Sequence, residues 1–375
     1  MPIHRFYSNH LMAKMILFFI SAMNAKYFLL QALELAKIRR GFCAPNPSVG
    51  AVVVSETGEV LAMGYHLGAG YAHAEVDALK KINGKARGAV IYITLEPCCH
   101  WGKTPPCTDA IIQAGIKHVV YGFADPNPLV SQKSKAILAA ENISCEYVAV
   151  PEIMAFYASY QYWQMNKKPW VTAKIALSLD GKIAGKKGEP MQITGPELKK
   201  LTHECRQRSD AILTTAKTII LDDPQMNVRR TEIIAKPVYI LDRELKLPLH
   251  AKIFSTAKSI TLFHAKNISA NQIKIFTEKN VRCVAVDVEQ NKLNLMAVMK
   301  HIGEDGVHDL WVEAGGTCFA ELARQQLLQK ILIYVAPRWL GSGVDAFDKN
   351  FSLDIAAAKV SWQQIGNDVV CEIIF

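Results

Sequence analysis

Hydrophobic residues in the first half of the chain recur first with helical spacing and then in short runs. Between residues 24 and 40 they share one face of a helix. Two apolar runs follow, Val49–Val54 and Val60–Tyr65, and the turn residues between them predict a hairpin. Amphipathic stretches and apolar runs then alternate. They predict helices at 74–82, 107–114 and 131–140 and strands at 89–94, 117–122 and 144–149. This alternation is typical of an α/β sandwich with a mainly parallel sheet beyond the hairpin.

A second alternating series begins at residue 170. It predicts helices at 195–207, 291–302 and 316–327 and strands at 170–177, 210–214, 237–241, 259–263, 281–286, 308–312, 329–336 and 368–375. The stretch between the two series, residues 151–168, is rich in aromatic residues and predicts a connecting helix. We therefore expect two domains, residues 24–150 and 169–375, joined by the helix at 151–168.

Residues 1–23 form a segment of their own. Arg5 and Lys14 precede the short apolar run Met15–Ala22, a pattern that imitates a secretory signal. Met23, however, stands directly before the first amphipathic helix. An extension from an upstream start codon is therefore favoured over a targeting segment.

Composition and charge narrow the class of protein. Hydrophobic residues make up 50% of the 375 residues, which indicates globular domains, and no apolar run is long enough to predict a membrane span. The net charge is +9, yet residues 24–150 carry 12 basic and 10 acidic residues and residues 151–375 carry 29 and 24. This mixed distribution disfavours a nucleic-acid-binding protein and suits a small anionic ligand. Nine cysteines, an odd number, indicate reduced thiols in a cytoplasmic protein.

The strongest chemical signal is the segment His73-Ala74-Glu75, followed by Pro97-Cys98 and then Cys107. A zinc deaminase needs three protein ligands, a coordination position open to water, and a nearby carboxylate that does not bind the metal. Glu75 suits that last role, and Cys107 opens a predicted helix whose N-terminus favours a thiolate. A closed structural site that also uses Cys99 is a second possibility. It is less favoured because the side chains of adjacent cysteines diverge.

The spacing of the cysteines departs from the usual deaminase signature, since eight residues rather than two separate Cys98 from Cys107. Together with its flanking motifs, this long metal loop resembles the bifunctional deaminase–reductase family of riboflavin biosynthesis. The motifs are Asn46-Pro47-Ser48-Val49-Gly50, Gly64-Tyr65-His66, His73-Ala74-Glu75-Val76, Thr94-Leu95-Glu96-Pro97-Cys98-Cys99-His100, Gly102-Lys103-Thr104-Pro105-Pro106-Cys107 and Asp125-Pro126-Asn127-Pro128.

The resemblance implies a cytidine-deaminase-like three-layer sandwich in the first half. It implies one zinc ion per chain, held by His73, Cys98 and Cys107, with Glu75 as the proton shuttle. Zinc-bound hydroxide would attack the aminated pyrimidine carbon and expel ammonia, and Asn46 would bind the substrate.

The second half, from residue 170, resembles the reductase domain of the same family, an α/β domain with a dihydrofolate-reductase-like fold. Gly315-Gly316, between a predicted strand and a predicted helix, could cradle a pyrophosphate, and the absence of a Gly-x-Gly-x-x-Gly fingerprint disfavours a Rossmann dehydrogenase. By resemblance, the residues that bind NADPH are Ala176, Gln192, Thr218, Asp222, Gly315, Gly316 and Thr317. Those that bind the substrate are Lys174, Pro190, Arg206, Met226, Arg229 and Glu313. The arginines suit a phosphate because guanidinium groups bind its oxygens in pairs.

The reductase half also departs from its family. Pro190-Met191-Gln192-Ile193-Thr194 stands where members usually have Ser-x-Trp-Ile-Thr, so a hydroxyl is missing on the substrate side and an indole on the cofactor side. Met226-Asn227 replaces the common Leu-Thr, and Tyr239 replaces an arginine. In the first domain, Ser131–Ser134 replaces a segment that contains glycine.

The sequence therefore favours an enzyme of two steps. It would deaminate 2,5-diamino-6-(5-phosphoribosylamino)pyrimidin-4-one and then reduce the ribose of the product with NADPH, giving 5-amino-6-(5-phosphoribitylamino)uracil. A nucleic-acid-editing zinc deaminase, or a deaminase whose second domain is inactive and serves packing, remains as an alternative. We expect a phosphorylated pyrimidine as substrate, no nucleic-acid or membrane partner, and a homo-oligomer formed through the reductase domain.

Overall fold

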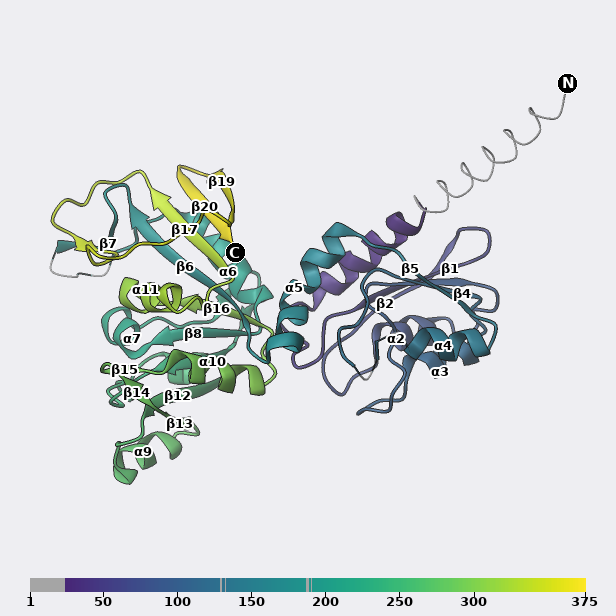
Figure 1. Cartoon of the computed structure of the whole chain (residues 1–375), viewed down its shortest axis with the longest axis horizontal. Helices are drawn as coiled ribbons and strands as arrows, with labels where there is room; N and C mark the ends of the chain where they lie inside the picture. The colour runs from purple at the N-terminus through teal and green to yellow at the C-terminus, as the bar shows by residue number, and fades with distance from the viewer. Residues whose placement is uncertain (1–23, 129, 132, 187–188, 190) are drawn as a thin grey trace, which may run out of the picture. The chain divides into compact units, whose positions relative to one another are not determined.

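The computed structural model describes residues 24–128, 130–131, 133–186, 189 and 191–375. Expectations about the segment 1–23 and about Pro190 lie outside these residues. The chain divides into two compact units, the first ending at Met165 and the second beginning at Asn166 (Figure 1). None of the helices within the described ranges is both long and apolar enough to cross a membrane.

The first unit is built on a mixed sheet of five strands in the order β2-β1-β3-β4-β5. β1 pairs antiparallel with β2 and β3, whereas β3, β4 and β5 are parallel, as the apolar pattern predicted. The strands are β1 (Gly50–Val54), β2 (Val60–Tyr65), β3 (Val90–Ile93), β4 (His118–Tyr121) and β5 (Ser144–Tyr147).

Alternating residues of these strands face two separate cores. Val52 and Val54 of β1 pack with the first helix, residues 24–38, and with α5 (Pro151–Asn166). Ala51 and Val53 pack on the opposite face. That face is covered by α2 (Ala74–Lys81), α3 (Cys107–Gln113) and α4 (Lys133–Ala140). The unit is thus an α/β/α sandwich of three layers.

The helix α5 is an integral part of the first unit. Ile153, Phe156 and Tyr157 are buried in its core. The Tyr157 hydroxyl donates to the Ser48 carbonyl oxygen at 2.8 Å and lies 2.7 Å from the Thr94 hydroxyl. The expected connecting helix therefore contributes to the wall of the sandwich as well as leading out of it.

The second unit contains a nine-stranded sheet in the order β13-β12-β11-β8-β16-β6-β17-β20-β19. Neighbouring strands from β13 to β17 are parallel, and the last two pairs, β17–β20 and β20–β19, are antiparallel. These strands are β6 (Trp170–Ser178), β8 (Ala211–Thr215), β11 (Pro237–Leu241), β12 (Ser259–Ala265), β13 (Arg282–Val286), β16 (Asp309–Glu313), β17 (Lys330–Ala336), β19 (Lys359–Ile365) and β20 (Asp368–Ile374).

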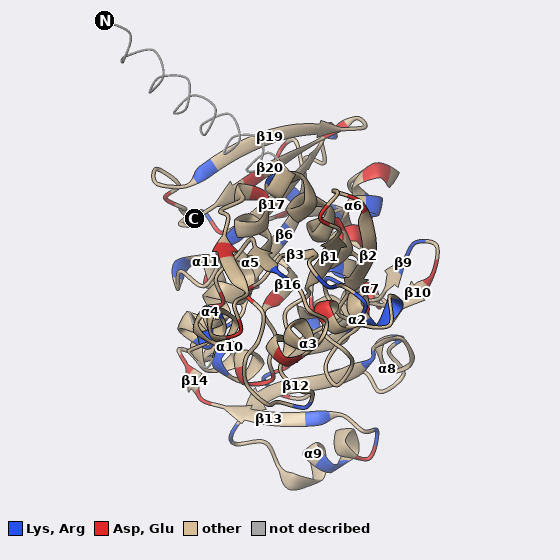
Figure 2. Ribbon diagram, turned by 90° about the vertical axis from the view of Figure 1, so that its right-hand side faces the viewer, with Lys and Arg blue, Asp and Glu red and all other residues tan. Residues whose placement is uncertain are grey.

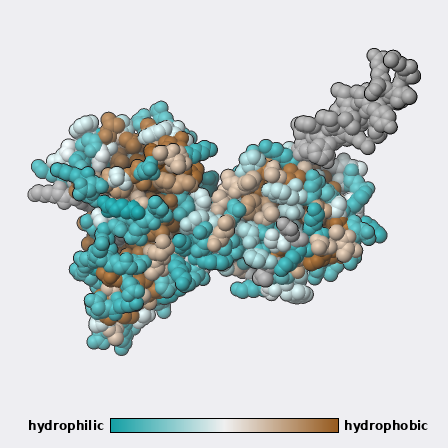
Figure 3. All heavy atoms as spheres, viewed as in Figure 1, coloured by the Kyte–Doolittle hydropathy of each residue, from teal (hydrophilic) through white to brown (hydrophobic). Residues whose placement is uncertain are grey.

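Helices cover both faces of this sheet. One core includes side chains of α10 (Leu295–Glu304) and α11 (Gly316–Arg324). The other includes side chains of α6 (Pro196–Arg208), α7 (Ala216–Asp222), α8 (Ile253–Thr256) and α9 (Ala270–Thr277). Three short antiparallel pairs complete the unit: β7 (Lys182–Ala184) with β18 (Val344–Asp345), β9 (Val228–Arg229) with β10 (Ile233–Ile234), and β14 (Val288–Glu289) with β15 (Lys292–Leu293). On the face shown in Figure 3, hydrophobic residues of this unit lie among hydrophilic ones.

The structure corrects three expectations for the second unit. The helix expected at 291–302 begins only at Leu295, because β14 and β15 form a hairpin and the Asn294 side chain accepts the Ala297 N–H at 2.8 Å. The strand β19 was not expected, since six of its seven residues are exposed and give no apolar alternation. The helices α7, α8 and α9 were not expected either, because each has at most eight residues and is too short to establish a helical period.

Candidate active sites

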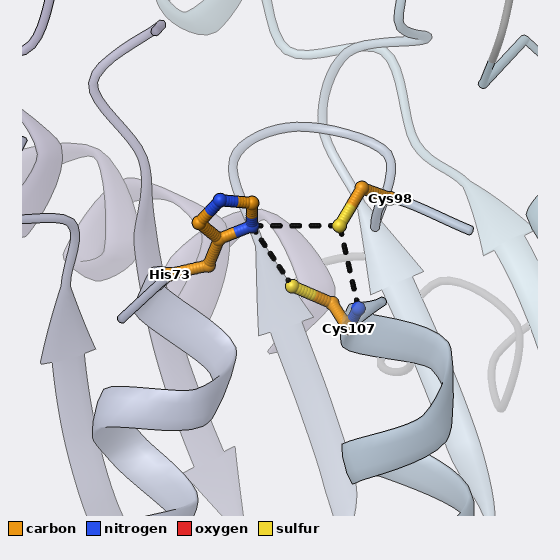
Figure 4. A group of neighbouring side chains, drawn as sticks. All are labelled: His73, Cys98 and Cys107. Atoms are coloured by element: carbon orange, nitrogen blue, oxygen red, sulfur yellow. Dashed lines mark hydrogen bonds between the residues drawn. The ribbon is translucent and has the colours of Figure 1, made fainter. Parts of the chain in front are cut away.

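Three side chains from separate segments of the first unit form a compact group. His73 precedes α2, Cys98 lies in the loop after β3, and Cys107 is the first residue of α3. His73 Nδ1 lies 3.2 Å from Cys107 Sγ and 3.4 Å from Cys98 Sγ, and the Cys107 N–H donates to Cys98 Sγ at 3.3 Å (Figure 4). The ligand atoms of the group lie within 4.8 Å of one another. One imidazole nitrogen and two thiols at this spacing fit a tetrahedral zinc ion with a fourth position open.

Close packing of α2 against β2 fixes the position of His73. A Cβ at Gly64 would lie 2.3 Å from the carbonyl oxygen of Ala74, so only glycine allows this approach. Ala74 and Ala78 are buried along the same helix face. The first turn of α2, with His73 before it and Glu75 within it, is therefore held rigidly over the sheet.

The two thiols of the group share protons. The hydrogen bond from the Cys107 thiol lowers the pKa of Cys98 to about 4, whereas that contact and burial raise the pKa of Cys107. Zinc prefers thiolates, and a divalent cation would take the place of the shared proton. Cys99 stays outside the group, and burial raises the pKa of its thiol.

Glu75 lies beside the group and is 3% exposed. Burial raises the pKa of its carboxyl, and the Cys107 thiol contacts it. A raised pKa makes the carboxyl hold a proton more readily, so that it can return one to a reacting group. Glu75 therefore lies where a proton shuttle for a metal-activated water is needed.

Asn46 is oriented by a histidine that the sequence analysis did not single out. Nδ1 of His66 lies 3.0 Å from the Ala72 carbonyl oxygen, so that nitrogen carries the proton and Nε2 accepts from the Asn46 amide at 3.2 Å. This contact turns the Asn46 carbonyl oxygen away from His66. The His66 ring also packs edge-on against His73, with ring centroids 5.0 Å apart. The motif Gly64-Tyr65-His66 contained the signal for this residue, but spacing alone gave it no role.

In the second unit, the expected substrate residues gather at the carboxyl ends of three parallel strands. β16 lies between β6 and β8, and Glu313 is paired in register with Lys174. Arg206 reaches Glu313 from α6 with Nη2 at 2.9 Å from Oε2 and Nε at 2.5 Å from Oε1. Trp311, also missed from the sequence, donates its indole N–H to Glu313 at 2.7 Å. The signal was its position two residues before Glu313, on the same face of the strand.

Glu313 is ionised in this environment. Burial opposes its ionisation, but the charge of Arg206, its hydrogen bonds and the charge of Lys174 outweigh burial and hold the pKa of Glu313 at about 2. Burial lowers the pKa of Lys174, whose ammonium lies 5.5 Å from the ring centroid of Tyr334. The site thus holds a negative charge between the buried guanidinium of Arg206 and the half-buried amino group of Lys174.

The remaining substrate candidates, Met226 and Arg229, lie in the segment before β9 and in β9 itself. Met226 is buried and has a left-handed backbone with φ of 47°. The carbonyl oxygen of the next residue, Asn227, accepts from Arg206 Nη1 at 2.8 Å. The Arg229 guanidinium is exposed and donates to the Asn227 side-chain oxygen at 2.6 Å.

Six of the seven expected NADPH residues lie at the same strand ends. They are Ala176 on β6, Thr218 and Asp222 on α7 after β8, and Gly315, Gly316 and Thr317 at the start of α11 after β16. A Cβ at Gly315 would meet nothing within 4 Å, so its backbone is open to a ligand at the helix N-terminus. Gly316 is glycine for another reason, since a Cβ there would lie 1.5 Å from the Ala346 carbonyl oxygen.

Gln192, the seventh candidate, is held by other contacts. Its side-chain amide donates to the Thr194 carbonyl oxygen at 3.2 Å, and its backbone carbonyl oxygen accepts from Arg338 at 3.0 Å. The side chain is exposed. Tyr239, where the family often has arginine, donates its hydroxyl to Asp305 at 2.8 Å and is buried.

Comparison with known proteins matches both halves of the chain. Residues 23–123 match the cytidine and deoxycytidylate deaminase zinc-binding region, and residues 169–371 match the RibD C-terminal domain. The riboflavin biosynthesis protein RibD of Aquifex aeolicus is 37% identical over 352 residues, which cover 92% of this chain and 97% of that protein. The structure of Acinetobacter baumannii RibD is 31% identical, with a TM-score of 0.83, and the match covers 94% of this chain and 99% of that one.

A third relative has a name that describes two activities. The Thermotoga maritima diaminohydroxyphosphoribosylaminopyrimidine deaminase/5-amino-6-(5-phosphoribosylamino)uracil reductase is 30% identical, with a TM-score of 0.82, over 94% of this chain and 99% of that one. These matches confirm the expected fold class, a deaminase sandwich followed by an α/β reductase domain. They also favour the two-step enzyme over the nucleic-acid-editing alternative.

Proposed function

This chain belongs to the RibD family of bifunctional deaminase–reductases of riboflavin biosynthesis, and from that premise we propose which of its residues carry each reaction. The first reaction deaminates a phosphoribosylamino-pyrimidine, and the second reduces the ribose of the resulting 5-amino-6-(5-phosphoribosylamino)uracil. Zinc serves the first reaction and NADPH the second. The observation that carries the assignment of residues is the group His73, Cys98 and Cys107 with the buried Glu75 beside it.

In the deaminase site, His73, Cys98 and Cys107 hold the metal, and Glu75 moves protons. Zinc, when bound, supplies a Lewis acid that activates water. Glu75 accepts a proton from that water and delivers protons to the pyrimidine ring and to the departing amine. Asn46, turned by His66, orients the pyrimidine by a hydrogen bond from its carbonyl oxygen. The buried surroundings of Glu75 exclude bulk water from these transfers.

Serine substitutions distinguish the metal-binding cysteine from its neighbour. Cys98→Ser should lose most of its zinc, whereas Cys99→Ser should keep one zinc per chain, because only Cys98 lies within the group around His73. Loss of a thiolate ligand should weaken zinc binding by at least roughly 100-fold. Metal analysis after dialysis against a weak chelator measures this. Zinc loss from the Cys99 variant alone would show that the wrong cysteine is assigned.

In the reductase site, Lys174, Arg206, Arg229, Met226 and Glu313 bind the substrate, and Pro190 stays assigned to it by resemblance alone. NADPH, when bound, would supply the hydride that reduces the ribose carbon attached to the amino nitrogen, giving the ribityl chain. The buried ion pair between Arg206 and Glu313 lies at the base of the proposed substrate site, and the Lys174 amino group lies beside it. The exposed guanidinium of Arg229 suits the substrate phosphate. The open backbone of Gly315, Thr218 and Asp222 border the cofactor.

The missing indole gives a direct test of cofactor affinity. Gln192→Trp should tighten NADPH binding by roughly 5- to 150-fold, because an indole buries more apolar area against a cofactor ring than an amide does. Titration of the full chain with NADPH by fluorescence measures the change, and Gln192→Leu controls for loss of the amide. Weaker binding in the tryptophan variant would mean that the side-chain hydrogen bond from Gln192 to Thr194 had been essential to the site.

Product analysis tests the two-step function itself. With the diaminopyrimidine phosphoriboside alone, the chain should release ammonia and yield the uracil derivative. When NADPH is added, mass spectrometry should detect a product heavier by two hydrogen atoms. Deamination without any reduction at saturating NADPH would instead support an inactive second domain.

Partners and compartment follow from the same chemistry. Lys and Arg are interspersed with Asp and Glu over the ribbon (Figure 2), and the modest excess of positive charge suits a small phosphorylated ligand. The nine cysteines are free thiols, including the proposed metal ligands, and such thiols persist in the reducing cytoplasm. We place the enzyme there, as a homo-oligomer assembled through its reductase domain and without nucleic-acid or membrane partners.

A further inference from the structure

A buried histidine next to the reductase site has no role in the scheme above. His203 lies on α6, three residues before Arg206, and is 5% exposed. Its Nδ1 lies 3.2 Å from the backbone nitrogen of Arg229, which donates its N–H to the ring. Nδ1 must therefore be without a proton, and the neutral ring carries its proton on Nε2. Burial and the charges of Arg206 and Arg229 lower the pKa of His203 to about 4, which agrees with this arrangement.

The Arg229 N–H is donated out of the short hairpin to which it belongs. In the antiparallel pair of β9 and β10, Arg229 lies opposite Ile233, yet its N–H points outward to α6 rather than across to that strand. The Arg229 side chain is held at the same time by Asn227 Oδ1 at 2.6 Å and Gln225 Oε1 at 3.0 Å. The His203 contact thus holds the backbone from which the Arg229 side chain extends, and the two side-chain contacts orient the guanidinium at its end.

Two further arginines join the same helix to the same segment, and their contacts differ in kind. Arg206 fixes the Asn227 carbonyl oxygen and belongs to the proposed substrate site. Arg230, on the outer side, donates to Glu204 at 3.1 Å and to Gln207 at 3.0 Å, and these exposed contacts attach the hairpin without touching Arg229. Arg230 is therefore a natural control for general attachment.

We propose that His203 is a positioning residue for the reductase reaction: by accepting the Arg229 N–H, it sets the place from which the Arg229 guanidinium binds the phosphate of the substrate. The inference rests on the proposed role of Arg229. It assigns to His203 a contribution to substrate affinity, with no contact to the reacting atoms and no part in hydride transfer. An acceptor is what the position requires, and a neutral imidazole supplies one amid three cations, namely Lys199, Arg206 and Arg229.

Two variants of equal branching test the acceptor. His203→Asn places Oδ1 where Nδ1 stood, whereas His203→Leu places a methyl group there. In the full chain, the leucine variant should raise the KM for 5-amino-6-(5-phosphoribosylamino)uracil by roughly 5- to 100-fold, because a buried N–H loses its acceptor. Its kcat and its KM for NADPH should change less than about threefold. The asparagine variant should restore the KM to near the wild-type value, and Arg230→Ala should leave it there.

A kcat and a KM for NADPH near the wild-type values, measured in the same preparations, report that the second unit of each variant is folded. An unchanged KM in the leucine variant, a loss confined to kcat, equal losses in the leucine and asparagine variants, or an equal loss in Arg230→Ala would each overturn the proposal. Arg229→Met separates the proposal from its premise. If that variant binds the substrate normally, the assigned role of Arg229 fails. If it raises the KM while His203→Leu does not, only the role of His203 fails.

Discussion

Replacing Glu75 with glutamine should abolish deamination while the chain keeps its zinc. The amide preserves the shape of the side chain in its buried position, but it cannot accept a proton from water or return one to the amine. General acid–base catalysis contributes roughly 10²- to 10⁴-fold to a rate, and a residue that serves several transfers contributes at the upper end. Ammonia release from the diaminopyrimidine phosphoriboside measures the loss.

Reductase activity provides the internal control for this variant. Glu75 lies in the first unit, so NADPH oxidation with the uracil substrate should continue at the wild-type rate. Metal analysis should find one zinc per chain, because Glu75 is not among the three grouped ligands. A zinc-loaded variant that deaminates at nearly the normal rate would remove Glu75 from the mechanism.

Glu313→Gln should destabilise the second unit by about 3 kcal/mol near neutral pH and abolish its reductase activity. The substitution leaves the guanidinium of Arg206, which is 7% exposed, without its counter-charge. Breaking a buried ion pair from one side is strongly destabilising because the remaining charge stays in a low-dielectric setting. Urea unfolding at pH 7 measures the free energy of unfolding, and NADPH oxidation measures the activity.

The pH dependence of stability gives this prediction a sign. The pKa of Glu313 lies at about 2 in the folded chain and at the ordinary 4.5 when unfolded. The unfolded state therefore takes up a proton first as the pH falls. The stabilisation by Glu313 is complete above pH 4.5 and is lost between 4.5 and 2. In the glutamine variant, the free energy of unfolding should therefore fall less steeply between pH 4.5 and 2 than in the wild type. An equally steep fall in the two proteins would contradict the prediction.

A double variant separates the ion pair from its individual charges. Arg206→Met combined with Glu313→Leu removes both charges and fills the space with apolar side chains. Such replacements are often neutral or stabilising, so the double variant should unfold at a higher urea concentration than Glu313→Gln. Its reductase activity should stay lost, because both groups belong to the proposed substrate site.

Much of the fold could be predicted from the sequence, because the apolar positions along each helix and strand are those that the fold buries. In both series, the spacing of apolar residues marks the strands and helices. All five residues of β1, for example, are apolar or glycine and are buried. The strand β19 was not predicted because it is an exposed edge strand, in which apolar and polar residues need not alternate. The helix α7 was not predicted because seven residues are too few to establish a helical period.

The metal group was predictable to a greater extent than the reductase site. His73, Cys98 and Cys107 belong to motifs whose residue types are rare and whose chemistry is narrow. By contrast, the contact between Arg206 and Glu313 joins residues 107 positions apart in the chain. No local pattern reports such a pair. The acceptor role of His203 depends on the packing of α6 beside β9 and became visible only in three dimensions. The indole contact of Trp311, by contrast, is local to one strand.

The helix α5 limits the positions at which the gene for such a two-domain enzyme could be divided into two or formed by fusion. Its side chains complete the hydrophobic wall of the deaminase, and the Tyr157 hydroxyl binds the backbone at Ser48, more than a hundred residues earlier. A free-standing deaminase descended from this chain would have to retain the whole helix, well past the last strand of its sheet at Tyr147. The residues after Asn166 already belong to the second unit, because the backbone of Lys167 and Lys168 packs directly against Gly303 of α10. Fusion or fission of the two genes that leaves both products able to fold would therefore fall at the end of α5.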